Sequence, residues 1–85
     1  MAILRPERFQ KDFARLPDQI QERAERALRR LAGEPRHPSL RLKKMEGAAG
    51  IWECRVSDNY RITFQLASEG ILLRRIGTHD MLRRP

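Results

Sequence analysis

His79, near the end of the chain, is the side chain best suited to acid–base chemistry. An imidazole can donate or accept a proton near neutral pH. Arg74 and Arg75 precede it in a predicted strand, and fixed positive charges of this kind can hold a phosphate. This combination is typical of phosphodiester cleavage by proton transfer, without a metal ion.

A second basic pair, Arg55 and Arg61, flanks a tight turn predicted at residues 57–59. The alternation of apolar and polar residues points both side chains away from the core, and strand pairing brings them side by side. Two adjacent like charges repel each other unless an anion lies between them, and phosphate suits the planar guanidinium. Glu53 and solvent could equally neutralise these charges on an ordinary surface, so the residues alone leave both interpretations open.

Further candidates lie around the glycine-containing loop predicted at residues 47–50. Lys43, Lys44 and Glu46 end the preceding strand, where long side chains could reach a substrate bound on the sheet. Surface solubility explains these charges equally well. Cys54 falls on the apolar side of the next strand, which favours a buried structural role over nucleophilic catalysis.

The last strand decides which arginine accompanies the histidine. Counting by twos places Arg75 and His79 on one side of this strand, and Arg74 on the other with Leu72 and Ile76. Leu72 and Ile76 should cover the core. We therefore expect Arg75 to share the polar face with His79, and Arg74 to lie off the site.

Two helices are expected in the first forty residues. Pro6 and Pro17 each suit the first turn of a helix, and Gly33 with Pro35 ends the second helix. Apolar residues recur every three to four positions in both segments: Phe9, Phe13, Leu16, Ile20, Ala24, Ala27, Leu28 and Leu31. Each helix therefore has an apolar stripe that needs a second layer to cover it.

After residue 40 the apolar period changes to two, which is typical of strands. With a short first strand at residues 2–5, the element order predicts a two-layer α+β domain. Its N-terminal helical hairpin should pack on a twisted, mostly antiparallel sheet of four to five strands. The helices should cover the face that carries Trp52, Tyr60, Ile62 and Phe64. The opposite face should be open and polar, with Glu53, Arg55, Arg61 and Gln65.

The 85 residues include 18 Lys and Arg against 11 Asp and Glu, a formal net charge of +7. This excess favours a polyanionic partner, first nucleic acid and then an acidic protein, with a merely soluble surface as the alternative. The length allows a single domain, residues 1–85. One cysteine and two histidines without metal-ligand spacing predict no metal and no cofactor. We expect a cytoplasmic protein, because no segment could span a membrane or act as a signal peptide.

A family resemblance rests on short segments in a fixed order: Phe9 and Phe13, Pro38-Ser39-Leu40, Gly50-Ile51-Trp52-Glu53-Cys54-Arg55-Val56, Asn59-Tyr60-Arg61-Ile62 and Ile76-Gly77-Thr78-His79. In order and spacing, these segments resemble the RelE/ParE superfamily of bacterial toxins from type II toxin-antitoxin systems. The resemblance covers nearly the full length and implies a RelE-like fold. The ending is most similar to the YafQ-like branch of mRNA interferases.

The resemblance implies a ribosome-dependent endoribonuclease that cuts mRNA without a metal. It also implies inhibition by an acidic antitoxin within a hetero-oligomer. In such toxins the ribose 2′-hydroxyl attacks the adjacent phosphate, which leaves a cyclic phosphate and a free 5′-hydroxyl. Arg61 matches the arginine that contacts the scissile phosphate in RelE-like toxins, and His79 matches the general acid of YafQ-like toxins.

Departures from the family pattern concern the general base. RelE has lysines at about the positions of Glu53 and Arg55, and arginine is too basic to act as a base. Glu46 and Glu53 are candidate bases, and Lys43 is a weaker one. YafQ-like toxins carry further histidines and an aspartate that have no match in this chain.

Two other functions share the same fold: inhibition of DNA gyrase by ParE-like toxins, and antitoxin binding by a member that cleaves nothing. His79 favours RNA cleavage over gyrase inhibition, because the ParE-like branch needs no acid at this position. The predicted catalytic residues are His79, Arg61, Arg55, Glu53 and Glu46. The predicted phosphate-binding residues are Lys43, Lys44, Arg55, Arg61 and Arg75.

Overall fold

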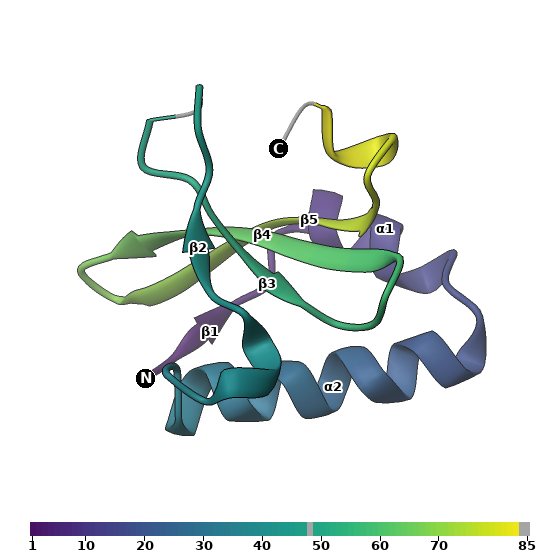
Figure 1. Cartoon of the computed structure of the whole chain (residues 1–85), viewed down its shortest axis with the longest axis horizontal. Coiled ribbons are helices and arrows are strands. Elements are labelled where there is room, and N and C mark those ends of the chain that lie inside the picture. Colours follow the sequence, from purple (N-terminus) through teal and green to yellow (C-terminus); the bar gives the residue numbers. More distant parts are fainter. Residues whose placement is uncertain (48, 84–85) are drawn as a thin grey trace.

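The computed structural model describes residues 1–47 and 49–83, and it confirms the two-layer α+β fold (Figure 1). A five-stranded sheet has the order β1-β5-β4-β3-β2, in which β1 is parallel to β5 and the other neighbours are antiparallel. In chain order the elements are β1 (Ile3–Leu4), α1 (Glu7–Ala14), α2 (Asp18–Gly33), the 3-10 helix η1 (Pro38–Leu40), β2 (Lys43–Lys44), β3 (Trp52–Arg55), β4 (Tyr60–Ala67), β5 (Gly70–Thr78) and the 3-10 helix η2 (Met81–Arg83).

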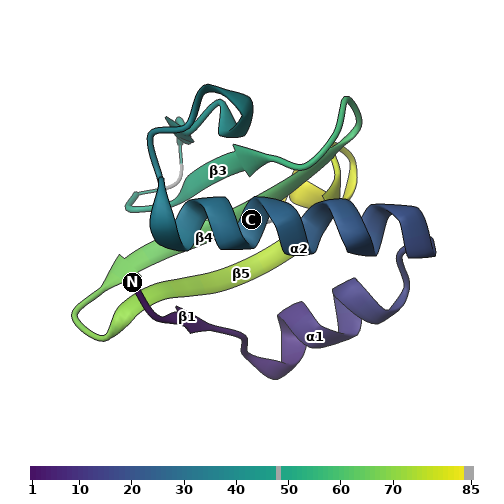
Figure 2. The ribbon, with the colours of Figure 1, turned by 90° about the horizontal axis from the view of Figure 1, so that it is seen from below.

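The two helices occupy different places on the sheet. Pro6 and Pro17 immediately precede α1 and α2, as their fixed φ angle favours. Helix α2 lies across one face of the sheet, whereas α1 lies beside β5 (Figure 2). Their apolar stripes meet strand residues in one hydrophobic core, whose fully buried members include Phe9, Ala24 and Ile62.

An irregularity between β4 and β5 changes which residues of β5 face the core. Thr63 pairs with Arg75, but Phe64 pairs with Leu73, so Arg74 is an extra residue without a strand partner. Because this bulge shifts the alternation by one position, Leu73 and Ile76 are both buried. The prediction that Leu72 covers the core is therefore wrong: this side chain is only half-buried.

The face of the sheet opposite α2 is less open than predicted. The C-terminal turn η2 lies on this side, and so does the loop between β2 and β3 (Figure 1). Leu82 of η2 is buried, and η2 contacts β5. Two polar residues of the central strands, Glu53 and Thr63, are buried as well. The turn η2 and the loop between β2 and β3 therefore border the polar face, which is only partly open.

Candidate functional site

Arg55 and Arg61 lie directly opposite each other on β3 and β4, as the hairpin prediction required. Their neighbours Cys54 and Ile62 form the preceding pair and are fully buried in the core on the α2 side. Since successive strand residues alternate between faces, the two arginines belong to the polar side. The sequence therefore predicted this pair and its face correctly.

The turn between β3 and β4 fixes the position of Arg61. Its Nη1 donates hydrogen bonds to the carbonyl oxygens of Ser57, Tyr60 (3.0 Å) and Asp58 (3.3 Å). These bonds immobilise one end of a half-buried guanidinium. A pre-positioned cation loses little rotational freedom when it binds an anion.

Arg55 is paired with the same turn, through the carboxylate of Asp58. The predicted alternative had Glu53 and solvent balancing the two arginines. Asp58 balances one of them instead, and its side chain is itself almost fully exposed. An exposed ion pair of this kind is weak, so an incoming phosphate can compete for Arg55.

Glu53 has a different partner. Its carboxylate lies 3.3 Å from the Nζ of Lys43 on the adjacent strand, and only 10% of the Glu53 side chain is exposed. Lys44 is opposite Trp52, and its Nζ lies 5.9 Å from the centre of the indole ring. Of the two lysines predicted to bind phosphate, only Lys43 therefore contacts a residue of the polar face.

His79 comes directly after β5 and is exposed. Tyr60 pairs with Thr78, so the histidine stands beside the turn that also holds Arg61. It lines a shallow cavity of about 360 Å³ with Asn59, Tyr60, Thr78 and Asp80. Arg61 and His79 thus lie at the same end of the sheet. Glu46 is exposed and lies in the turn after β2.

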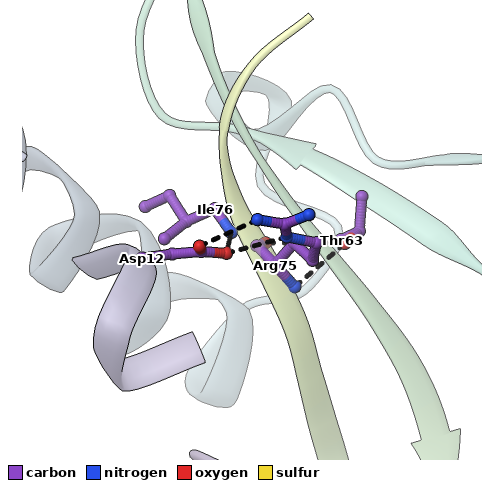
Figure 3. Close-up of polar contacts among 4 residues, drawn as sticks. All are labelled: Asp12, Thr63, Arg75 and Ile76. Atoms are coloured by element: carbon purple, nitrogen blue, oxygen red, sulfur yellow. Dashed lines mark hydrogen bonds and ion pairs between the residues drawn. The ribbon is translucent and has the colours of Figure 1, made fainter. Parts of the chain in front are cut away.

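Arg75 pairs with Thr63 and so lies on the polar side of β5, as predicted, but its guanidinium is already bound by a carboxylate. Its Nε and Nη2 each donate a hydrogen bond of 2.9 Å to the carboxylate of Asp12 on α1 (Figure 3). Asp12 also accepts a bond from the backbone N–H of Ile76, and the Thr63 hydroxyl accepts one from that of Arg75. The carboxylate raises the pKa of the Arg75 guanidinium. Arg75 thereby attaches α1 to β5.

Arg74 was predicted to lie on the core side, and this is also wrong. Its Nη1 donates a 3.0 Å hydrogen bond to the side-chain oxygen of Gln65, a residue of the polar face. The bulge is the reason, because counting by twos assumes an unbroken strand. Arg75 keeps the polar side of the strand that the sequence predicts, and the bulge gives Arg74 a contact on that side as well.

Asp12 and Asp58 were missed by the sequence reasoning. Asp12 falls three residues after Phe9 and four before Leu16, so it lies on the apolar stripe of the first helix. A carboxylate on a buried stripe requires a partner, and this signal was available. Asp58 was assigned only a role in the turn.

The arrangement combines a held guanidinium, a second arginine at the opposite strand position, a nearby imidazole and a buried carboxylate. Together these groups can bind a phosphate, stabilise negative charge on it and transfer a proton. Within residues 1–47 and 49–83, no group of three His, Cys, Asp or Glu could hold a metal ion. In the same ranges, no helix has the length and apolar character needed to cross a membrane.

Comparisons with known proteins agree with the fold. Residues 3–83 match the family described as ParE toxin of type II toxin-antitoxin system, parDE. A search of curated proteins finds no match.

Solved structures share the architecture over almost the whole chain. A chain of the RelB-RelE antitoxin-toxin complex from Methanococcus jannaschii is 23% identical, with 95% of each chain covered and a TM-score of 0.73. YafQ from E. coli strain BL21(DE3) is 17% identical, with 95% of this chain and 96% of that chain covered and a TM-score of 0.78. The YoeB/ParE toxin from Agrobacterium tumefaciens is 16% identical, with 93% and 99% covered and a TM-score of 0.77. At these identities the similarity establishes the fold alone.

Proposed function

This chain belongs to the ParE toxin family of type II toxin-antitoxin systems, within the RelE/ParE superfamily, and we propose that it is an mRNA endoribonuclease acting on the ribosome without a metal. The observation that carries the proposal is the position of Arg55, Arg61 and His79. The two arginines occupy directly opposite positions on β3 and β4, and an exposed imidazole lies at the same end of the sheet.

In the proposed reaction, the ribose 2′-hydroxyl attacks the adjacent phosphorus. The bond to the 5′ oxygen of the next nucleotide breaks, which leaves a 2′,3′-cyclic phosphate. Arg61 and Arg55 bind the phosphate oxygens and stabilise the charge that develops on them. His79 donates a proton to the departing 5′ oxygen.

We assign the general base to Glu53 rather than to Glu46. Glu53 is the strand neighbour of Arg55 and lies on a central strand of the sheet, whereas Glu46 belongs to a bordering loop. Lys43 holds the Glu53 carboxylate in place through their ion pair. A fixed carboxylate near the arginines can accept the proton of the 2′-hydroxyl.

The proposed partners follow from the same assignment. They are the ribosome with its mRNA, and an acidic antitoxin that binds the toxin in a hetero-oligomer. The net charge of +7 suits both RNA and an acidic protein. The proposed location is the cytoplasm, where translation takes place.

Inhibition of DNA gyrase is the second candidate function. The family description itself favours it, because the matched family is named for the ParE toxin. His79 and the paired arginines then have no catalytic task, which gives a direct experimental distinction between the two functions.

The deciding experiment expresses the toxin, maps mRNA 5′ ends, and assays DNA supercoiling by gyrase in the same extract. We expect new mRNA ends within translated regions and unchanged supercoiling. His79→Gln should reduce the abundance of these mRNA ends by a factor of about 100 or more, because general acids typically contribute that much to the rate of cleavage. Antitoxin binding should be unchanged. Loss of supercoiling without new mRNA ends would refute the proposal and establish the alternative.

Arg61 provides a separate test of the phosphate site. Arg61→Ala removes both the charge and the fork of donors, so we expect cleavage to fall at least about 100-fold. Arg61→Lys keeps the charge but not the bonds to the turn, and should recover only part of the activity. Arg8→Ala, an exposed substitution on α1, is the matched control. Cleavage at the wild-type rate by the Arg61→Ala variant would remove this residue from the site.

A further inference from the structure

A second basic site lies between α2, η1 and the end of β3. It is a cavity of about 440 Å³, and half of its lining residues are arginines: Arg23, Arg26, Arg30, Arg41 and Arg55. Its other lining residues are apolar or neutral, and none is acidic. Nothing in the proposed reaction uses the four arginines other than Arg55.

The fold brings these arginines together from three segments. Arg23, Arg26 and Arg30 are three and four residues apart, so they form one row along α2. Arg41 follows η1 with a φ of 43°, a left-handed conformation that turns the chain toward β2. Arg55 comes from the end of β3.

Most of these charges lack a compensating group. Arg30 donates a 2.7 Å hydrogen bond to the Ser39 hydroxyl, which fixes its position without neutralising it. Among the described residues, Arg23, Arg26 and Arg41 form no hydrogen bond or ion pair. Several cations around one cavity repel each other, and a bound anion removes that repulsion.

Arg55 connects this cavity with the proposed cleavage site. It lines the cavity and is also directly opposite Arg61. Strand β2 pairs with β3 only at Trp52 and Glu53, so the sheet has no further strand beside Arg55. The cavity therefore begins at this edge of the sheet, at the residue opposite Arg61.

We propose that this cavity is a second phosphate subsite, which binds the backbone of the same RNA strand next to the scissile phosphate. The inference rests on the proposed function, since it extends that site along the substrate. A continuous polyanion fits a row of arginines that begins at the cleavage site. An acidic peptide could contact the same arginines, but it would have no reason to continue across Arg55 to Arg61.

The test measures binding of a 2′-O-methyl RNA octamer, which cannot be cleaved, by fluorescence anisotropy at several salt concentrations. Arg23→Gln/Arg26→Gln should weaken binding about tenfold or more at low salt. It should also reduce the slope of log affinity against log salt by about 1.4, because two phosphate contacts on a single strand are lost. The charge-preserving Arg23→Lys/Arg26→Lys variant should retain the wild-type slope.

The matched control is Arg8→Gln/Arg29→Gln, which removes the same charge from exposed positions outside the cavity. Its slope of log affinity against log salt should be closer to the wild-type slope than that of the Arg23→Gln/Arg26→Gln variant. Equal losses in the two double variants would show a general charge effect and overturn the subsite. Unchanged octamer binding with weakened antitoxin binding would also overturn it, in favour of an acidic peptide.

Arg61→Gln separates the subsite from the proposed function. We expect this variant to weaken octamer binding as well. If only the cavity variant binds more weakly, the cavity is an RNA site and the proposed cleavage site is wrong. If the wild type cleaves mRNA on ribosomes but the cavity variant binds the octamer normally, the function stands and the subsite is rejected.

Discussion

Arginine performs different tasks in this protein according to what lies beside it. Arg61 is held by backbone carbonyls, Arg74 by an amide oxygen and Arg75 by the carboxylate of Asp12. The carbonyl oxygens around Arg61 leave its positive charge available to an anion, whereas the bidentate carboxylate of Asp12 satisfies that of Arg75. Residue type alone therefore does not identify the arginines that we propose to bind phosphate. The neighbouring acceptor does.

Removal of Asp12 tests the role of its ion pair with Arg75. The side chains of Arg75 and Asp12 are 18% and 5% exposed, so Asp12→Ala would leave a largely buried cation without a partner. We expect the free energy of unfolding to fall by about 2–4 kcal/mol, as measured by urea denaturation. The exposed Asp18→Ala, on α2, should cost less than about 0.5 kcal/mol.

A double variant separates ion pairing from simple packing. With Arg75 also replaced by Ala, the cation is gone, so the combined loss should be smaller than the sum of the two single losses. Strict additivity of the two substitutions would show that Asp12 stabilises the protein independently of Arg75.

At the level of elements, β5 organises both the core and the site. It pairs with β1 on one side and β4 on the other, and α1 packs against it. Its bulge redirects Arg74, and its end places His79 beside the turn of Arg61. The start of β5 is equally constrained, because Gly70 lies against the backbone of Ala2.

Gly70→Ala should destabilise the attachment of β1 to β5. A Cβ at Gly70 would lie 2.3 Å from the carbonyl oxygen of Ala2, and the φ of 143° disfavours any other residue. That carbonyl accepts a 2.8 Å hydrogen bond from the N–H of Ile71. We expect a loss of about 2–4 kcal/mol in unfolding free energy and faster amide exchange at Ile71.

Gly33→Ala is the control for this prediction. Its Cβ would have nothing within 4 Å, and the residue ends α2. Alanine should therefore be neutral or stabilise the protein by up to about 1 kcal/mol. Equal effects of the two substitutions would show that the contact with Ala2 is unimportant.

At the level of the whole molecule, the hydrophobic core contains the ionisable thiol of Cys54. Burial, reinforced by the charge of Glu53 and opposed by that of Arg61, raises the pKa of this thiol from 9.0 to about 12. A thiol that stays protonated in the folded state acts as a small apolar side chain. This agrees with the structural role that the alternation of the strand predicts.

Global stability should consequently depend on pH through Cys54. Its folded pKa lies above the unfolded value, so the contribution is complete below about pH 9 and decreases as the pH rises toward 12. We expect the wild type to lose more unfolding free energy than Cys54→Ala between pH 8.5 and 10.5. Urea denaturation at several pH values measures this difference, and parallel curves would contradict it.

The sequence determined the parts of the protein that depend on local periodicity. Proline positions and apolar spacing predicted the two helices, alternation predicted the strands, and the turn at residues 57–59 fixed the opposition of Arg55 and Arg61. The buried position of Cys54 followed in the same way. These features could be read from the chain because each is set by interactions between residues close in sequence.

Tertiary structure alone decided the remainder of the site. The contact of Arg74 with Gln65 arose from a bulge, and that of Arg75 from a carboxylate 63 residues away. Glu53 was buried by a fold that also paired it with Lys43. The arginine cavity joins three segments that no sequence pattern connects. The sequence determines residue type and charge, but folding determines the distance from each cation to a compensating charge. That distance decides which cations can bind phosphate.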